Sequence, residues 1–232
     1  ITEQFRSTVD NWHPINGRAD AEVASMVRAD GIDVLVCLAG RFDRNRPLVC
    51  AHRAAPVQVS YHDGATSGLR EMDYWLTDNF LHPPDTKEMF TEELHRLPVF
   101  YQWFGIQEAP PVAAVPAEQA GMITFGSFNN PAKVNEEVIR LWSEILGSVP
   151  ESRLLLKYKN WYNQVSLRDS MIEKFSACGI VQDRIIFAVT LDTLTEHLGR
   201  YSEVDIALDP FPYNGTTTTF QALWMGVPVV SL

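Results

Sequence analysis

The sequence is poor in cysteine and contains no long apolar run. Cys37, Cys50 and Cys178 are odd in number, and none belongs to a Cys-x-x-Cys pair. Each stands among apolar residues, so we expect buried free thiols, which are typical of a reducing compartment such as the cytoplasm. The longest apolar stretch, "IDVLVCLAG", has the length of a strand, whereas a membrane-spanning helix needs roughly 20 apolar residues. We therefore expect no membrane span.

Positive charge is also scarce. The 232 residues include 19 Lys and Arg against 29 Asp and Glu, which gives a formal net charge of −10. This balance argues against a nucleic-acid partner and against an anionic membrane surface. An anionic ligand would have to be held by a local arrangement of donors, yet the glycine-rich phosphate signatures GxGxxG and GxxxxGK(S/T) are absent from the sequence. No internal repeat is visible either.

The two ends of the chain have the character of cut ends. The sequence begins at Ile1 rather than at a methionine and shows no signal peptide. It stops at Leu232 within "GVPVVSL", which has the pattern of a strand that has just begun. We therefore expect this chain to be a piece of a longer protein.

From residue 121 onward, short apolar strands alternate with helices. We expect strands at 122–128, 152–158, 183–189, 204–209 and 228–232. We expect helices at 134–149, 165–179 and 193–201, and one more that begins in the threonine segment after 213. Alternation of this kind predicts a parallel sheet covered on both faces. Ligands of such sheets bind in the loops at the carboxyl ends of the strands.

The first half of the chain is less regular. It contains a predicted helix at 19–31 and predicted strands at 32–40, 55–61 and 73–78. Prolines among small residues in 107–121 indicate a linker. We therefore predict a partial α/β domain over 1–108, a linker over 109–120 and a second α/β domain over 121–232.

The segment "YNGTTTTFQAL" (213–223) begins a helix in an unusual way. It places four consecutive threonines, Thr216 to Thr219, ahead of an apolar helical pattern. Threonine is β-branched and loses rotamer freedom in a helix, and one threonine is enough for an N-cap. Hydroxyls together with the unpaired N–H groups of a helix start would suit a phosphate. A capped helix whose threonines are tolerated by packing is the alternative interpretation.

Two further residues are candidates for the same site. Lys133 in "GSFNNPAKV" (126–134) is expected in the first turn of the following helix, where a cation opposes the helix dipole. That placement is useful if the amine reaches an anion, and otherwise Lys133 is an ordinary surface lysine. His197 in "LTEHLGRY" is a lone histidine on a short helix, and such a histidine is more often structural.

Several of these segments occur in one chain in one order and resemble a known family. They are "DGIDVLVCLAG", "APVQVSY", "TSG", "MDYWLTD", "GSFNNPAKV" and "EVDIALDPFPYNGTTTTFQALWMGVPVVSL". Together they resemble the catalytic region of the bacterial branch of the O-GlcNAc transferase family, over about residues 17–232. The resemblance implies an α/β glycosyltransferase B fold with two Rossmann-like domains, both incomplete in this chain. It also implies transfer of a sugar, chiefly GlcNAc, from a UDP-sugar to serine or threonine of a protein. Helical repeats would accompany this region in the longer chain.

The resemblance assigns roles to particular residues. Lys133 becomes the catalytic residue at the donor diphosphate, and Asn130 and His197 lie beside the nucleotide. The other substrate-binding positions implied are Thr216, Thr217, Thr218, Gln221, Thr66, Ser67 and Gly68. The last three form a "TSG" loop that faces the donor sugar. No DxD-like metal motif is evident, so neither a metal nor any other cofactor is expected, and the UDP-sugar is a substrate.

The chain departs from the family pattern at four places. Cys37 and Arg41 stand where the bacterial pattern has aspartate and histidine, and "HDGA" (62–65) replaces a glycine-tyrosine-proline-glycine turn. Gln221 replaces an acidic residue expected at the ribose. One alternative is therefore a catalytically impaired module that binds UDP or a UDP-sugar. A second alternative is an enzyme resembling a UDP-sugar epimerase, although the additional acid and base carboxylates that such an enzyme needs have no clear match.

Overall fold

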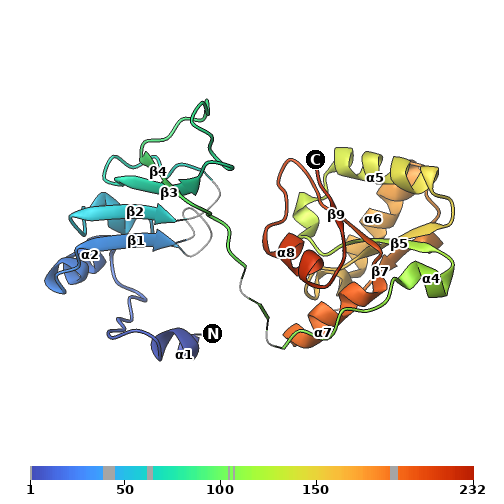
Figure 1. Ribbon diagram of the computed structural model, residues 1–232, viewed down its shortest axis with the longest axis horizontal. Helices are drawn as coiled ribbons and strands as arrows, with labels where there is room; N and C mark the ends of the chain where they lie inside the picture. Colours follow the sequence, from blue (N-terminus) through green and yellow to red (C-terminus); the bar gives the residue numbers. More distant parts are fainter. Residues whose placement is uncertain (1, 39–44, 62–64, 104, 107, 189–192) are drawn as a thin grey trace. The chain divides into compact units, whose positions relative to one another are not determined.

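The computed structural model describes residues 2–38, 45–61, 65–103, 105–106, 108–188 and 193–232. The chain divides into two compact units, unit 1 (Ile1–Gln102) and unit 2 (Trp103–Leu232), each with its own parallel sheet (Figure 1). The predicted linker 109–120 falls within unit 2, where α4 (Pro116–Ala120) forms. Within the described ranges, no helix is long and apolar enough to cross a membrane.

Unit 1, as far as it is described, is built on a four-stranded parallel sheet of order β1-β2-β3-β4. Its elements are α1 (Thr2–Arg6), α2 (Asp20–Ala29), β1 (Val34–Leu38), α3 (Leu48–Ala51), β2 (Val57–Tyr61), β3 (Tyr74–Asp78) and β4 (Glu93–Leu97). Val23 and Ala24 of α2 pack against Val49 of α3 and Leu35 of β1. Strand β4 has no counterpart among the predicted strands, because its sequence "ELHRL" mixes charged and polar residues with leucines and lacks a continuous apolar run. Charged side chains of this kind protect edge strands from pairing with other chains.

The described part of unit 2 contains a five-stranded parallel sheet of order β7-β6-β5-β8-β9. The strands are β5 (Ile123–Ser127), β6 (Ser152–Leu156), β7 (Ile185–Phe187), β8 (Ile206–Leu208) and β9 (Val229–Val230). The helices are α5 (Glu136–Ser148), α6 (Val165–Ala177), α7 (Leu194–Gly199) and α8 (Thr217–Trp224), with 3-10 turns η1 (Pro131–Lys133), η2 (Trp161–Asn163), η3 (Gln182–Arg184) and η4 (Arg200–Glu203). Each predicted strand and helix of this half therefore forms, with bounds shifted by a few residues.

The strand order of unit 2 reverses at its centre. From β5 the chain proceeds outward through β6 to β7, and it then returns to place β8 on the opposite side of β5. The carboxyl ends of β5 and β8 thus meet at a topological switch point, where ligands of open α/β sheets bind.

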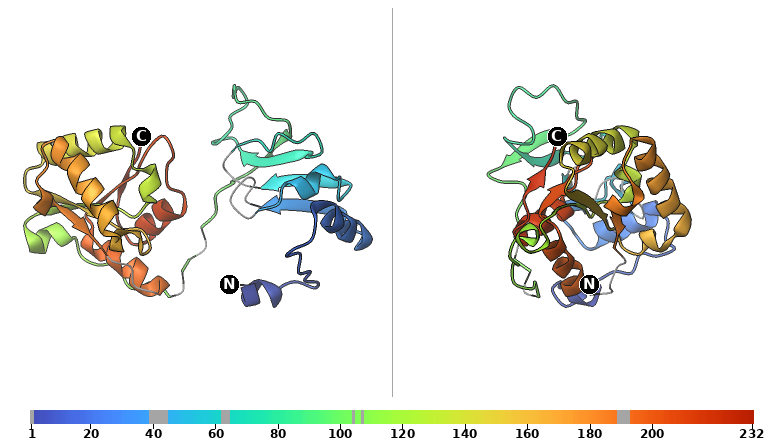
Figure 2. Two further views of the ribbon diagram at one scale, coloured as in Figure 1. Left: turned by 180° about the vertical axis from the view of Figure 1, so that it is seen from behind. Right: turned by 90° about the vertical axis from the view of Figure 1, so that its right-hand side faces the viewer.

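The sheet of unit 2 is covered on both faces, as the apolar strands predict. Leu154 and Leu156 belong to a core with α5 and α6, whereas Leu155 faces the opposite way into a core with α7 and α8. Figures 1 and 2 show these two pairs of helices on opposite sides of the strands. The sheet thus carries one apolar core on each face, and the loops at its carboxyl edge follow strands that are packed on both sides.

The three cysteines are free thiols, but they are not all buried as predicted. Cys50 is buried, Cys37 is half-buried and Cys178 is exposed. Cys178 follows the last residue of α6, where its neighbours Phe175 and Ile180 occupy the core instead. The expectation of burial is therefore wrong for Cys178.

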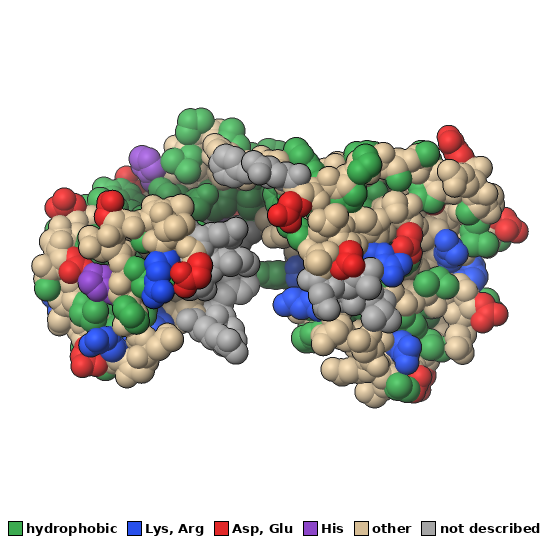
Figure 3. Space-filling model, turned by 90° about the horizontal axis from the view of Figure 1, so that it is seen from below, with side chains coloured by type: hydrophobic (Ala, Val, Ile, Leu, Met, Phe, Trp, Pro, Cys, Tyr) green, Lys and Arg blue, Asp and Glu red, His purple; other side chains and the backbone are tan. Residues whose placement is uncertain are grey.

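Charged side chains are dispersed over the surface. On the face drawn in Figure 3, Lys and Arg side chains are interspersed with Asp and Glu over both units rather than gathered into a basic stripe. This dispersal leaves the attraction of an anionic ligand to local groups.

Candidate functional site

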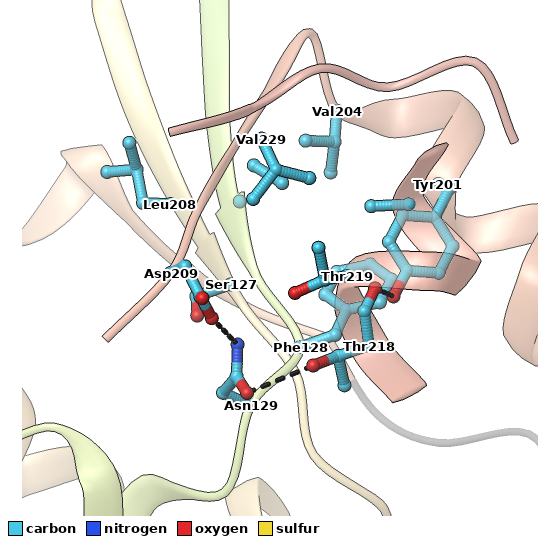
Figure 4. Close-up of a pocket in the computed structure, with 13 residues that line it drawn as sticks. Ser127, Phe128, Asn129, Tyr201, Val204, Leu208, Asp209, Thr218, Thr219 and Val229 are labelled. Atoms are coloured by element: carbon cyan, nitrogen blue, oxygen red, sulfur yellow. Dashed lines mark hydrogen bonds between the residues drawn. The ribbon is translucent and has the colours of Figure 1, made fainter. Parts of the chain in front are cut away.

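The switch point of unit 2 joins segments that are distant in the sequence. Asn129, just after β5, donates through Nδ2 to the Asp209 carboxylate at 3.2 Å. Its Oδ1 accepts a hydrogen bond from the Thr218 hydroxyl at 3.0 Å. Figure 4 shows Asn129 between these two partners. One side chain thus connects the loop after β5 with the end of β8 and with the first turn of α8.

Asp209 holds the loop that leads into α8. The residue is 6% exposed, and its carboxylate accepts hydrogen bonds from the Gly215 N–H at 2.8 Å and from the Ser231 hydroxyl at 3.2 Å. A Cβ at position 215 would lie 2.3 Å from Thr218 Oγ1 and 2.8 Å from Asn129 Oδ1. Only glycine fits between these groups, so the loop conformation depends on it.

The four threonines, Thr216 to Thr219, differ in their hydrogen bonds and in their exposure. Thr219 donates to the Gly215 carbonyl at 2.8 Å, and Thr218 is the hydroxyl bound to Asn129. Thr216 is the N-cap residue, and Thr217 is exposed at the first position of α8. Two hydroxyls of the cluster therefore fasten the start of the helix, and Thr217 is exposed beside them.

Lys133 lies beside this segment, but not in the first turn of a helix as predicted. It ends the 3-10 turn η1, which Asn130 caps by accepting a hydrogen bond from the Ala132 N–H at 3.0 Å. Helix α5 begins only at Glu136. The Lys133 amine donates to the Asn214 carbonyl at 2.8 Å and lies 4.4 Å from the centre of the Tyr213 ring. Lys133 thus places a cation against the loop that precedes the threonines.

A chain of three side chains lies on the other flank of α8. Lys157, directly after β6, is 1% exposed, and its Nζ lies 2.6 Å from His197 Nδ1. His197 Nε2 lies 3.0 Å from Gln221 Oε1. Burial, with the charge of Arg200 as a smaller cause, lowers the pKa of Lys157 to about 8. Burial also lowers the pKa of His197, with the Gln221 hydrogen bond opposing and the Lys157 charge reinforcing the shift, so the imidazole is neutral at pH 7.

The remaining predicted residues belong to unit 1. The Thr66 hydroxyl donates to Glu92 Oε2 at 2.5 Å, and the Ser67 N–H donates to Glu92 Oε1 at 2.8 Å. Gly68 adopts a φ of +71° and donates its N–H to Thr66 Oγ1 at 3.3 Å. Burial acts to raise the pKa of Glu92, but the hydrogen bonds from Ser67 and Thr66 outweigh it, so the pKa is lowered. An ionised Glu92 therefore holds this loop.

The departures from the family pattern lie partly outside the described residues. Arg41 and residues 62–64 of the "HDGA" turn are among those outside. Cys37 is described at the end of β1. A hydrogen bond with the Cys50 thiol lowers the pKa of Cys37, burial acts to raise it, and the Asn45 amide lowers it further.

The interior cavity at the switch point is small. It lies between β5, β8 and α8, and its volume is about 10 Å³, which is room for about one water molecule. The Ser127 hydroxyl lies in its wall and has no hydrogen-bond partner among the described residues. A larger molecule does not fit in this cavity. Lys133, which reaches the Asn214 carbonyl, and the exposed Thr217 lie at the segment that begins α8, and we call this part of the surface the rim. The described residues contain no group of three or more His, Cys, Asp or Glu that could hold a metal ion.

Sequence reasoning missed several residues of the site. Asn129, Lys157, Asp209 and Glu92 were not predicted, although three of them carry a recognisable signal. Asp209 and Lys157 come directly after apolar strands, and Asn129 follows β5 by two residues. In a parallel sheet these positions meet at one edge. Glu92 precedes the charged strand β4, and the sequence offers no comparable signal for it.

Comparison with known proteins identifies similar chains. A sequence profile described as Glycosyl transferase family 41 matches residues 11–105 and 115–232. The Arabidopsis thaliana protein SPINDLY, named a probable UDP-N-acetylglucosamine–peptide N-acetylglucosaminyltransferase, is 42% identical over 223 residues, or 95% of this chain and 24% of that protein. The protein SEC from the same plant bears the same enzyme name and is 28% identical over 240 residues, or 99% of this chain and 24% of that protein.

Solved structures agree with these sequence matches. A mutant O-GlcNAc transferase from Thermobaculum terrenum superimposes with a TM-score of 0.87 and 36% identity, over 99% of this chain and 44% of that chain. The apo structure of OtsA gives a TM-score of 0.53 at 10% identity, over 90% of this chain and 59% of that chain, which bears on the fold alone. These likenesses confirm the predicted α/β glycosyltransferase B fold class. The chain spans about a quarter of the length of the curated relatives it matches.

Proposed function

The chain belongs to glycosyl transferase family 41, and from this membership we propose that it carries the donor site of an O-GlcNAc transferase-like glycosyltransferase. The proposed reaction moves GlcNAc from UDP-GlcNAc to a serine or threonine hydroxyl of a protein acceptor. The names of the SPINDLY and Thermobaculum relatives support this reaction. The activity is proposed for the whole protein, since the chain spans about a quarter of the curated relatives' length.

The position of Lys133 is the observation that carries the proposal. Its amine donates to the Asn214 carbonyl, one residue before Gly215 and two before the N-cap of α8. A diphosphate at the rim would meet this ammonium, the N–H groups of the helix start and the exposed Thr217. A cation and a helix N-terminus attract an anion together, although the chain as a whole carries a net charge of −10.

This arrangement suits the proposed chemistry. During transfer the acceptor oxygen forms a bond to the anomeric carbon, while the bond from that carbon to the diphosphate oxygen breaks and its electron pair leaves with UDP. Negative charge therefore grows on the diphosphate in the transition state. A positioned ammonium and helix N–H groups stabilise that growing charge more than they stabilise the ground state.

His197 and Gln221 would form the nucleoside side of the site. They lie on the flank of α8 and are joined by a 3.0 Å hydrogen bond. On the proposed reading, Asn130 and Thr216 to Thr218 contact the diphosphate or the nucleotide, and the Thr66–Gly68 loop of unit 1 contacts the donor sugar. The hydrogen bonds of that loop to Glu92 support a fixed loop conformation.

A second candidate is a module that binds UDP or a UDP-sugar without turnover. The observation in its favour is Cys37, which stands where the bacterial pattern has an aspartate and whose thiol pairs with Cys50 and Asn45. No carboxylate is available from that position. The two candidates therefore differ in turnover and agree in nucleotide binding.

One assay separates the candidates. The full-length protein is incubated with UDP-GlcNAc and a peptide library, UDP release is measured, and UDP binding is measured separately by calorimetry. Release that depends on peptide and is lost in Lys133→Ala supports the transferase. Binding without release supports the module, and the absence of both overturns the assignment of the site.

We also propose a cytoplasmic location, with a protein acceptor as the macromolecular partner. The three free cysteines support a reducing compartment. Fractionation of cells that express a tagged full-length protein would test this proposal, and recovery from a secreted fraction would contradict it.

A further inference from the structure

The buried Lys157 has no role in the proposed transfer, although it is among the most deeply enclosed side chains of unit 2. Its residue is 1% exposed. An ammonium is costly to bury without a partner, and the ion pairs of the described residues do not include it. Its contacts are His197 Nδ1 at 2.6 Å and the Phe128 ring, whose centre lies 5.2 Å from Nζ. The lysine is therefore held by a hydrogen bond and by a cation–π contact.

The contact with Lys157 decides where the imidazole of His197 carries its proton. An ammonium can only donate hydrogen bonds, so Nδ1 of His197 must accept. The proton of the neutral ring is then on Nε2, and Nε2 donates to Gln221 Oε1. The donor order runs from Lys157 through His197 to Gln221.

This order also sets the direction of the Gln221 amide. Its oxygen is taken by His197, and its amide nitrogen has no hydrogen-bond partner among the described residues. If His197 carried its proton on Nδ1, Nε2 would become an acceptor and the amide would turn, with its oxygen facing outward. The identity of residue 157 thus determines whether position 221 offers a donor or an acceptor.

The surrounding rings keep His197 from turning away. Phe128 and Tyr201 have ring centres 4.4 Å apart, and Tyr201 meets the His197 ring edge-on at 5.9 Å and 82°. The Tyr201 hydroxyl donates to the Thr218 carbonyl at 3.2 Å. The segment of α7 and η4 is therefore joined to α8 at two points, through Gln221 and through Thr218.

We propose that Lys157 is a positioning residue of the nucleotide site, whose ammonium holds His197 in its Nε2–H form and thereby turns the NH2 group of Gln221 toward the ligand. Position 221 then recognises a ligand oxygen that accepts a hydrogen bond, such as a hydroxyl of a ribose or a carbonyl of a base. The identity of this ligand rests on the proposed function, whereas the order of hydrogen bonds from Lys157 through His197 to Gln221 does not.

The first test measures the tautomer of the His197 imidazole directly. Nitrogen-15 NMR of the histidine side chains is recorded for the wild-type protein, for Lys157→Met and for Lys157→Arg, with His197→Gln to assign the signal. We expect Nε2–H in the wild type and in Lys157→Arg, which can still donate, and a mixture of tautomers in Lys157→Met. An unchanged tautomer in a folded Lys157→Met, or Nδ1–H in the wild type, overturns the proposal.

The second test measures the affinity for UDP by calorimetry. Lys157→Met should weaken binding roughly 10-fold, the lower end for one charge-assisted hydrogen bond. Gln221→Ala added to Lys157→Met should cost less than Gln221→Ala alone, because the two residues act through one chain. Lys159→Met is the matched control, since it removes the same charge from an exposed position two residues away. Equal losses in both lysine variants, or full additivity, contradict the positioning role. If the wild type does not bind UDP at all, the proposed function fails and the tautomer comparison still decides this inference.

Discussion

Asp209 accepts hydrogen bonds from three segments of unit 2, namely from Asn129 after β5, from Gly215 before α8 and from Ser231 after β9. At the scale of single residues, the candidate site is thus a set of polar side chains whose partners lie on other segments. Buried polar groups of this kind are satisfied by one another rather than by water. Loss of one member leaves the others without partners, which costs more than the bond itself.

The substitution Lys133→Ala tests the proposed contact between Lys133 and the donor diphosphate. Losing one charge-assisted contact should cost about 1.5–3 kcal/mol of UDP binding, or roughly 10- to 150-fold in affinity. Turnover should fall further, because the charge on the leaving group grows in the transition state. Calorimetry with UDP and transfer rates on the full-length protein provide the two numbers. Lys133→Arg should restore binding only in part, and an unaltered UDP affinity in Lys133→Ala would remove Lys133 from the site.

The substitution Gln221→Glu should raise the pKa of His197. It replaces a neutral amide oxygen 3.0 Å from Nε2 with a carboxylate, and a nearby negative charge favours the imidazolium. In the wild type the pKa of His197 is lowered, chiefly by burial. A proton NMR titration of the histidine signals measures the shift, with Gln221→Ala as the uncharged comparison. A pKa that stays at its wild-type position would mean that residues 197 and 221 are not in contact.

At the scale of elements, periodicity predicted the helices and strands of unit 2 well. Helices α5 and α6 bury apolar residues at helical spacing, and the strands of that unit are short and apolar. The turn at Lys133 was missed because the pattern of "NNPAKVNEE" does not show which asparagine begins the helix. Two of its three asparagines are caps: Asn130 caps η1, and Asn135 caps α5 by accepting from the Val138 N–H at 2.9 Å.

Local sequence patterns also limited what could be predicted of the site. Lys133, His197 and the threonine segment stand out by motif, and the fold brings them to one edge of one sheet. Lys157 could not be identified, because a lysine after a strand has the same appearance whether it is solvated or enclosed. Its partners are Phe128, which follows β5, and His197 of α7, and both are distant from it in the sequence. Contacts between residues that are distant in the sequence leave no pattern in the local sequence.

Replacement by alanine should have opposite effects on stability at two glycines of unit 2. Gly215→Ala would place a Cβ 2.3 Å from Thr218 Oγ1 and 2.9 Å from Asp209 Oδ1, and overpacking of this kind costs about 1–3 kcal/mol of stability. Gly147→Ala in α5 meets no atom within 4 Å and should stabilise the protein by up to about 1 kcal/mol, because alanine is the better helix former. Urea unfolding compares the two variants. Equal effects would show that the loop before α8 can move aside.

At the scale of the whole molecule, burial of ionisable groups makes stability depend on pH. The pKa of Lys157 falls from 10.5 to about 8 in the folded protein, so between these values the unfolded chain binds more protons. The free energy of unfolding therefore rises with pH across this window, by about 3 kcal/mol at 1.36 kcal/mol per pKa unit. Above pH 10 the trend reverses, because burial raises the pKa of Tyr162 and Tyr201 above the ordinary 10.0.

Urea unfolding at pH 7.5, 8.5 and 9.5 measures this dependence. The rise should be larger in the wild type and in Lys159→Met, whose lysine is exposed, than in Lys157→Met. The difference between the two lysine variants isolates the contribution of Lys157 from those of the cysteines and tyrosines. A rise of equal size in Lys157→Met would assign the effect to another group.

The hydrogen bonds from Asn129 to Asp209 and from Thr218 to Asn129 span 80 and 89 residues of chain. Contacts of such long range form late, after the entropy of closing the intervening loop has been lost. The rim beside α8 consequently exists only once β8 has docked on β5. A ligand that binds at this rim selects the completed fold and stabilises it by mass action. If the proposed nucleotide binds at this rim, its affinity measures how far the folding of unit 2 has gone.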